Sequence, residues 1–246
     1  VLHADYRADE FIDRFKVEAR TAVRLTAPNI VRIYDFDPEW PYLVMEYCGE
    51  GDLNRYIKSR RRRSLKELLT IARAVCEALV AAHGHQPPIL HRDLKPGNVL
   101  FHKGVPKVAD FGLVKGFDKS TSSGILGGVT PLYAPPETFQ GKITPQSDQY
   151  SLAIVYQELL TGHRPYVAKN IRQMAQMHMQ AEPDLRSLPE VERPVLARAL
   201  AKDPAKRYQN CMAFVAALYK ARSSARIVEV RQQPAAAAER HVYSER

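Results

Sequence analysis

The chain has 246 residues, 45% of them hydrophobic and 26% charged, which are ordinary proportions for a soluble globular protein. No apolar run approaches the roughly 18 residues that a membrane span needs, and the first residues carry no signal-peptide pattern. The formal net charge of +9 suggests an anionic partner, but much of it lies in one run from Lys58 to Arg63. Because charge runs usually face water and this one contains no aromatic residues, we interpret it as a solvated loop, and nucleic-acid binding is not indicated.

The first predicted elements form a small N-terminal part. Residues 9–25 are predicted to be helical because apolar residues recur at spacings of three and four. Two strand-like runs follow, Ile30 to Phe36 and Tyr42 to Glu46. The residues between them, 37–41, have the composition of a turn, so the two runs are predicted to pair as a hairpin.

Beyond Gly51 the pattern changes to long helices. Ser64 and Glu67 form a capping box, and one apolar face continues from there until Gly84 ends the helix. Short strand signals return at Val99–Phe101 and Lys107–Ala109.

A second long helix is predicted from Thr144-Pro145 to just before Gly162, and its body is apolar nearly all round, which is typical of a buried central helix. Three amphipathic segments follow, at 170–181, 190–202 and 210–221. The tail from Ala225 is interpreted as a linker or frayed end.

Cysteine usage bears on the compartment. Cys48, Cys76 and Cys211 are odd in number and lack metal-ligand spacing, which favours reduced thiols over a disulfide framework. We therefore expect a cytoplasmic protein, or the cytoplasmic part of a longer membrane-anchored one.

The segment His91 to Asn98, with the sequence HRDLKPGN, carries the chemistry. Phosphoryl transfer needs a carboxylate to receive the proton of an attacking hydroxyl and a nearby oxygen to hold magnesium, and Asp93 and Asn98 supply both. Asp110-Phe111-Gly112 adds a second acidic metal ligand on a turn. Either motif alone would be unremarkable solvated charge or a turn, but their order and spacing point to a phosphotransferase.

These motifs resemble the signature of Hanks-type serine/threonine protein kinases from Val1 to about Arg222. The resemblance implies an α+β, two-lobed fold with a truncated small lobe and a mostly helical large lobe, using ATP and Mg²⁺ to phosphorylate protein substrates. It divides the chain into a partial small lobe, a hinge, a large lobe and a flexible tail, at residues 1–45, 46–52, 53–222 and 223–246.

The same resemblance assigns roles in the catalytic machinery. Asp93 would be the catalytic base, Asn98 and Asp110 would bind magnesium, and Phe111 would set the active or inactive state. Lys95 and Thr130 match the serine/threonine branch, in which the Lys reaches the transferred phosphate and the Thr contacts the catalytic Asp and Lys.

Nucleotide contacts are implied at the hinge and beside it. Backbone groups of Glu46 and Cys48 would bind adenine, Asp52 would reach the ribose and Leu100 would form the floor of the adenine pocket. Met45 is interpreted either as the gatekeeper or as an ordinary core residue.

Further positions are assigned by the resemblance to structure and regulation. Glu18 would pair with the nucleotide-positioning Lys. Glu137 would pair with Arg207, and Asp148 would hold the backbone of the catalytic loop. Arg92 would clamp a phosphate added to the loop that follows Gly112, whose candidate acceptors are Ser120, Thr121, Ser122 and Ser123; that cluster is equally interpretable as a polar flexible loop.

One departure from the family is serious. The first glycine is Gly49, so no glycine-rich loop precedes the hinge, and Lys16 is the only lysine ahead of it. Lys16 and Glu18 would point to different faces of one helix and so cannot pair. We expect an N-terminally incomplete copy of a working kinase; the alternative is a catalytically impaired binding or scaffold module. A small-molecule kinase is disfavoured because such relatives lack the Thr130 to Glu137 segment.

Overall fold

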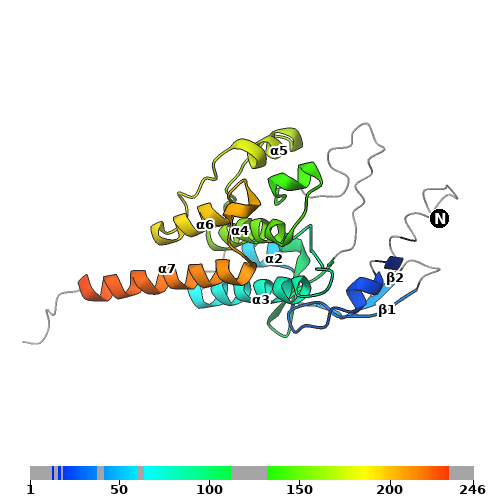
Figure 1. Ribbon diagram of the computed structural model, residues 1–246. Coiled ribbons are helices and arrows are strands. Elements are labelled where there is room, and N and C mark those ends of the chain that lie inside the picture. Colours follow the sequence, from blue (N-terminus) through cyan, green and yellow to red (C-terminus); the bar gives the residue numbers. More distant parts are fainter. Residues whose placement is uncertain are drawn as a thin grey trace, which may run out of the picture.

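The computed structural model describes residues 13, 16–17, 19–37, 42–59, 64–111 and 132–232, and for 225–232 it describes the backbone alone. A small part with β1 and β2 lies beside a larger, mostly helical part (Figure 1). This arrangement is the two-lobed α+β fold that the sequence predicts.

The small part contains the predicted helix and hairpin. Its described helical residues fall between Asp13 and Val23, and Ala19 and Ala22 are buried. Strands β1 (Ile33–Asp37) and β2 (Tyr42–Met45) pair antiparallel with one bulge. The predicted turn between them lies almost wholly outside the described residues.

A second two-stranded sheet, β3 (Val99–His102) and β4 (Val105–Val108), follows the segment His91 to Asn98, here called the catalytic segment. It joins the two parts, because the Val31 amide donates to the Val108 carbonyl at 2.9 Å and the Val108 amide donates to the Asn29 carbonyl at 2.7 Å. Both strands lie within one residue or two of their predicted positions.

The first long helix, α3 (Leu65–His83), begins at the predicted capping box. The Glu67 amide donates to Ser64 Oγ at 3.2 Å, and the Ser64 amide donates to Glu67 Oε2 at 2.9 Å. Gly84 follows its last residue, as predicted.

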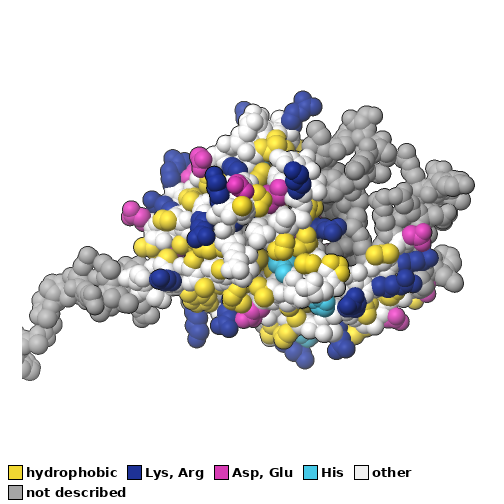
Figure 2. Space-filling view, viewed as in Figure 1, with side chains coloured by type: hydrophobic (Ala, Val, Ile, Leu, Met, Phe, Trp, Pro, Cys, Tyr) yellow, Lys and Arg dark blue, Asp and Glu magenta, His cyan; other side chains and the backbone are white. Residues whose placement is uncertain are grey.

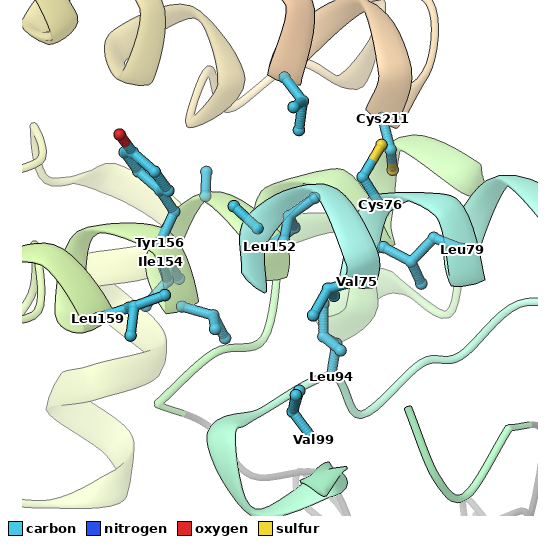
Figure 3. Close-up of a cluster of buried hydrophobic side chains, with 14 of the residues drawn as sticks. Val75, Cys76, Leu79, Leu94, Val99, Leu152, Ile154, Tyr156, Leu159 and Cys211 are labelled. Carbon is cyan, nitrogen blue, oxygen red and sulfur yellow. The ribbon is translucent and has the colours of Figure 1, made fainter. Parts of the chain in front are cut away.

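The second long helix, α4 (Pro145–Thr161), is the centre of the large part. It begins after Thr144 and ends at Gly162, whose φ of 73° is a left-handed conformation that glycine adopts at little cost. Most of its side chains are buried, and they lie on every face of the helix. Figure 3 shows Leu152, Ile154 and Leu159 of α4 in the same core as Val75 and Leu79 of α3.

The remaining helices pack around this pair. They are α2 (Leu53–Lys58), α5 (Ile171–Gln180), α6 (Arg193–Ala199) and α7 (Cys211–Gln232), with single 3-10 turns η1 (Pro96–Asn98), η2 (Pro136–Gln140), η3 (Glu190–Glu192) and η4 (Pro204–Lys206). The tail from Ala225, interpreted from the sequence as a linker or frayed end, is helical as far as Gln232, where α7 ends. No glycine or proline interrupts the chain there before Pro234, so nothing stops the helix.

Candidate active site

The catalytic segment lies between α3 and β3, and a buried carboxylate of α4 holds its backbone. Asp148 Oδ2 accepts from the His91 amide and Oδ1 from the Arg92 amide, both at 2.9 Å. His83 Nε2 of α3 lies 2.7 Å from Oδ2. Burial alone would raise the pKa of Asp148, but the hydrogen bonds from His83 and the His91 amide hold it below its ordinary value. Asp148 therefore stays ionised and fixes two consecutive amides, as predicted.

Three polar side chains of the catalytic segment converge. Lys95 Nζ donates to Asp93 Oδ2 at 2.6 Å, and Asn98 Nδ2 donates to the Asp93 carbonyl at 3.0 Å. Arg92, just before Asp93, has a φ of 69°, which bends the chain sharply at this point. Asp93 and Lys95 keep side-chain exposures of 17% and 22%, so the carboxylate is fixed yet reachable from solvent.

Asp110 lies next to Asn98 because the Ala109 amide donates to the Asn98 carbonyl at 2.8 Å. His91 Nε2 lies 3.0 Å from the Ala109 carbonyl, and burial lowers the pKa of His91. Asp110 itself is exposed and has a left-handed φ of 61°. The buried ring of Phe111 packs on His91 with centroids 4.9 Å apart.

The donor atoms at this point suit magnesium. Asn98 uses its amide nitrogen on Asp93, which leaves its amide oxygen available, and Asp110 contributes an exposed carboxylate beside it. Oxygen ligands are those that Mg²⁺ prefers, and it commonly takes one or two protein groups together with phosphate oxygens. Among the described residues, no cluster of three or more Asp, Glu, His or Cys side chains is arranged to hold a metal. The pair therefore fits a shared site with phosphates rather than a closed protein cage.

The predicted hinge residues follow β2. Met45 is 39% exposed and lines a small hollow with Asp110 and Phe111, which argues against its interpretation as a core residue. Leu100 is half-buried on β3, where it bridges to Asp52. The Asp52 carboxylate caps α2 by accepting from the Arg55 amide at 2.8 Å, a structural use that the sequence analysis missed.

The predicted pair of Glu137 and Arg207 is present and buried. Arg207 Nη1 and Nη2 donate to the two carboxylate oxygens at 2.7 and 2.8 Å, and Ser147 Oγ of α4 donates to the same carboxylate at 2.7 Å. Tyr133 makes a neighbouring contact, donating to Glu158 Oε2 at 2.6 Å. These bonds fix the segment after residue 131 onto α4.

Several predicted site residues lie outside the described residues. They are Glu18, Ser120, Thr121, Ser122, Ser123 and Thr130. Arg92 is described, and its side chain is exposed.

Sequence reasoning also missed three contacts around the site. His83 binds Asp148, while His102 and Lys107 contact the hinge residues Tyr47 and Glu46. The only sequence signal for His83 was its place in the last turn of a predicted helix. The two hinge contacts join residues far apart in sequence, so no local pattern could have revealed them.

The Protein kinase domain family model matches residues 3–233, nearly the whole chain. This chain is a protein kinase domain. It is 40% identical over 223 residues to the serine/threonine-protein kinase PrkC of Bacillus subtilis, covering 85% of this chain and 34% of that protein. It is 33% identical over 247 residues to PknA of Mycobacterium tuberculosis, covering 95% of this chain and 57% of that protein.

The kinase chain also resembles a solved structure. The crystal structure of the M. tuberculosis PknI kinase domain superposes with a TM-score of 0.66 at 29% identity, covering 87% of this chain and 80% of that one. The kinase chain thus spans between a third and three fifths of the length of the curated relatives PrkC and PknA. Within the described part of this kinase, no helix combines the length and apolar character needed to cross a membrane.

Proposed function

We propose that this domain is the catalytic part of a protein serine/threonine kinase, which transfers the γ-phosphoryl group of ATP to Ser and Thr hydroxyls of protein substrates. The observation that carries this proposal is the constellation of Asp93, Lys95 and Asn98 on a loop whose backbone is fixed by buried Asp148. Catalysis of phosphoryl transfer consists mainly of positioning and charge stabilisation, which such a rigid loop supplies.

Each residue has a role that its surroundings support. Asp93 orients the substrate hydroxyl and accepts its proton, while Lys95 places a positive charge beside the transferred phosphoryl group. Asn98 and Asp110 hold magnesium, which when bound offsets the negative charge of the phosphates. Thr130, by the family resemblance, contacts Asp93 and Lys95 and favours Ser and Thr acceptors.

The nucleotide contacts follow from the hinge. The Glu46 carbonyl and the Cys48 amide bind adenine, and Leu100 forms the floor of the pocket. Asp52 reaches the ribose with the carboxylate oxygens that also cap α2. Glu18 is the partner of the nucleotide-positioning lysine of the family.

Regulation is proposed through Arg92. Its exposed guanidinium is available to clamp a phosphate added at Ser120, Thr121, Ser122 or Ser123.

The distribution of surface charge indicates which kind of macromolecule the domain binds. Lys and Arg side chains are spread over the visible face, with acidic side chains between them, rather than gathered in one stripe (Figure 2). A stripe of that kind is the footprint expected of a nucleic-acid surface. The scattered charge accords with a protein substrate.

The test is phosphotransfer from Mg-ATP to a Ser- and Thr-containing acceptor protein by the 246-residue chain. We expect measurable transfer that falls by about 10²–10⁴-fold in Asp93→Asn. Asp35→Asn, on the exposed strand β1, is the matched control and should keep full activity. Equal rates in wild type and Asp93→Asn would contradict the proposal, and nucleotide binding without transfer would favour the binding-module alternative.

A further inference from the structure

The hinge segment 46–48 is held from the side of the large part by the β3–β4 hairpin. Lys107 Nζ lies 2.9 Å from Glu46 Oε2, and both side chains are only 14% exposed. The Arg32 amide donates to the same oxygen at 3.2 Å, and His102 Nε2 lies 4.0 Å from Oε1. The Glu46 carboxylate is thereby fixed from two sides, by Lys107 of β4 and by the backbone just before β1.

A second contact fixes the backbone of the next residue. His102 Nδ1 lies 3.1 Å from the Tyr47 carbonyl, whereas the Tyr47 side chain is 83% exposed. The hairpin also holds the chain beyond the hinge, since the Phe101 amide donates to the Gly51 carbonyl at 3.0 Å and the Gly104 amide donates to Glu50 Oε2 at 3.0 Å. The β3–β4 hairpin therefore contacts the chain at several points between Glu46 and Gly51 and fixes the path of this segment.

These contacts determine which hinge groups remain open. Residues 46–48 form neither helix nor turn, and in an extended run the peptide groups of successive residues point to opposite sides. Because the Tyr47 carbonyl is directed at His102, we expect the Glu46 carbonyl and the Cys48 amide to face away from β3. In the described part of the chain, the Cys48 amide has no hydrogen-bond partner, and the Glu46 carbonyl has only the Cys48 thiol at 3.9 Å.

We infer that Lys107 and His102 are positioning residues, which orient the hinge so that the Glu46 carbonyl and the Cys48 amide meet the adenine ring. The inference rests on the proposed kinase function and adds two residues to its nucleotide site. Burial acts to raise the pKa of Glu46, but the hydrogen bonds from Lys107 and Arg32 lower it, so the carboxylate is ionised at neutral pH and attracts Lys107.

The inference predicts that changing Lys107 lowers the affinity for ligands that contain adenine and not for those that lack it. Replacing Lys107 with Met leaves a poorly exposed carboxylate without its ion-pair partner, and the hinge shifts to solvate it. We expect the Kd for Mg-ADP to rise by roughly tenfold, which corresponds to about 1.4 kcal/mol of binding free energy. The Kd for Mg-tripolyphosphate, which has no adenine, should stay the same, and kcat should change by less than about twofold because Lys107 does not contact Asp93 or Lys95.

Binding is measured by calorimetry on the 246-residue chain. Lys103→Met is the matched control, since it removes the same charge from the exposed turn of the same hairpin. Lys107→Arg should recover most of the Mg-ADP affinity. If Lys107→Met does not fold, His102→Ala is the second variant, because it removes the contact with the Tyr47 carbonyl from a partly exposed position. It should raise the Kd for Mg-ADP by about threefold, the loss expected for one hydrogen bond.

The outcomes separate the two proposals. Wild-type chain that binds no nucleotide would favour the binding-module alternative and would overturn the inference with the nucleotide site on which it rests. Wild-type binding with an unchanged Kd for Mg-ADP in both Lys107→Met and His102→Ala would overturn the inference alone. An equal loss of Mg-ADP and Mg-tripolyphosphate binding would show a general structural role and would also contradict it.

Discussion

The tyrosines of the two parts show how differently these are built. Tyr150 and Tyr156 of α4 are 0% and 1% exposed, whereas Tyr34 of β1 and Tyr42 of β2 are 56% and 54% exposed. The large part buries both of these rings, and it also contains buried charge pairs such as Arg207 with Glu137. The small part offers a two-stranded sheet with open faces. Asp93, Lys95 and Asn98 are therefore attached to the buried core of the large part, while residues 46–48 are positioned by contacts with the β3–β4 hairpin.

This contrast predicts a large difference in local stability. Two-stranded sheets are marginal in water, and exposed strands open without unfolding the rest of the molecule. Amides of β1 and β2 should exchange with solvent at least about 100-fold faster than those in the middle of α3 and α4. Such a ratio needs a difference of only about 3 kcal/mol between the opening free energies of the two regions. Hydrogen exchange followed by mass spectrometry measures both regions in one sample. Equal protection of the β1 and β2 amides and of the α3 and α4 amides would contradict the predicted difference in local stability.

Within the large part, the strongest single contribution should come from Arg207 and Glu137. Arg207→Met leaves the Glu137 carboxylate buried without its bidentate partner, which should cost about 3–5 kcal/mol of unfolding free energy. Denaturant unfolding measures the loss. The exposed pair of Asp184 and Arg186 is the control, and Arg186→Met should leave the unfolding midpoint nearly unchanged because solvent screens that pair.

A smaller effect should appear as a dependence of stability on pH. Burial lowers the pKa of His91 in the folded state, so below about pH 6.5 the unfolded chain binds a proton that the folded chain excludes. Stability should therefore fall as the pH drops from 6.5, by up to about 1.4 kcal/mol per pH unit from this group. His91→Asn should flatten that slope between pH 6.5 and 5.5, whereas His163→Asn, at an exposed position, should not. A slope that His91→Asn leaves unchanged would assign the titration to another group.

The sequence could predict features that depend on local signals or motifs, but not contacts between residues far apart in the chain. The ends of α3 and α4 were placed correctly because caps and glycines are local signals, and the roles of Asp148 and Arg207 came from motifs. Helix α7 was predicted too short, because residues 222–232 mix charged, polar and β-branched residues without a clear helical apolar face. The contacts of Lys107 with Glu46 and of His102 with Tyr47 depend on tertiary structure alone.

The central claim is that α4 imposes the shape of the catalytic loop through Asp148, and amide protection at His91 and Arg92 tests it most directly. In the wild type both amides should be among the slowly exchanging ones. In Asp148→Ala they should lose at least about 10-fold of their protection, the loss expected for about 1.4 kcal/mol, while amides in the middle of α3 keep theirs. Unchanged protection at His91 and Arg92 in Asp148→Ala would contradict the account.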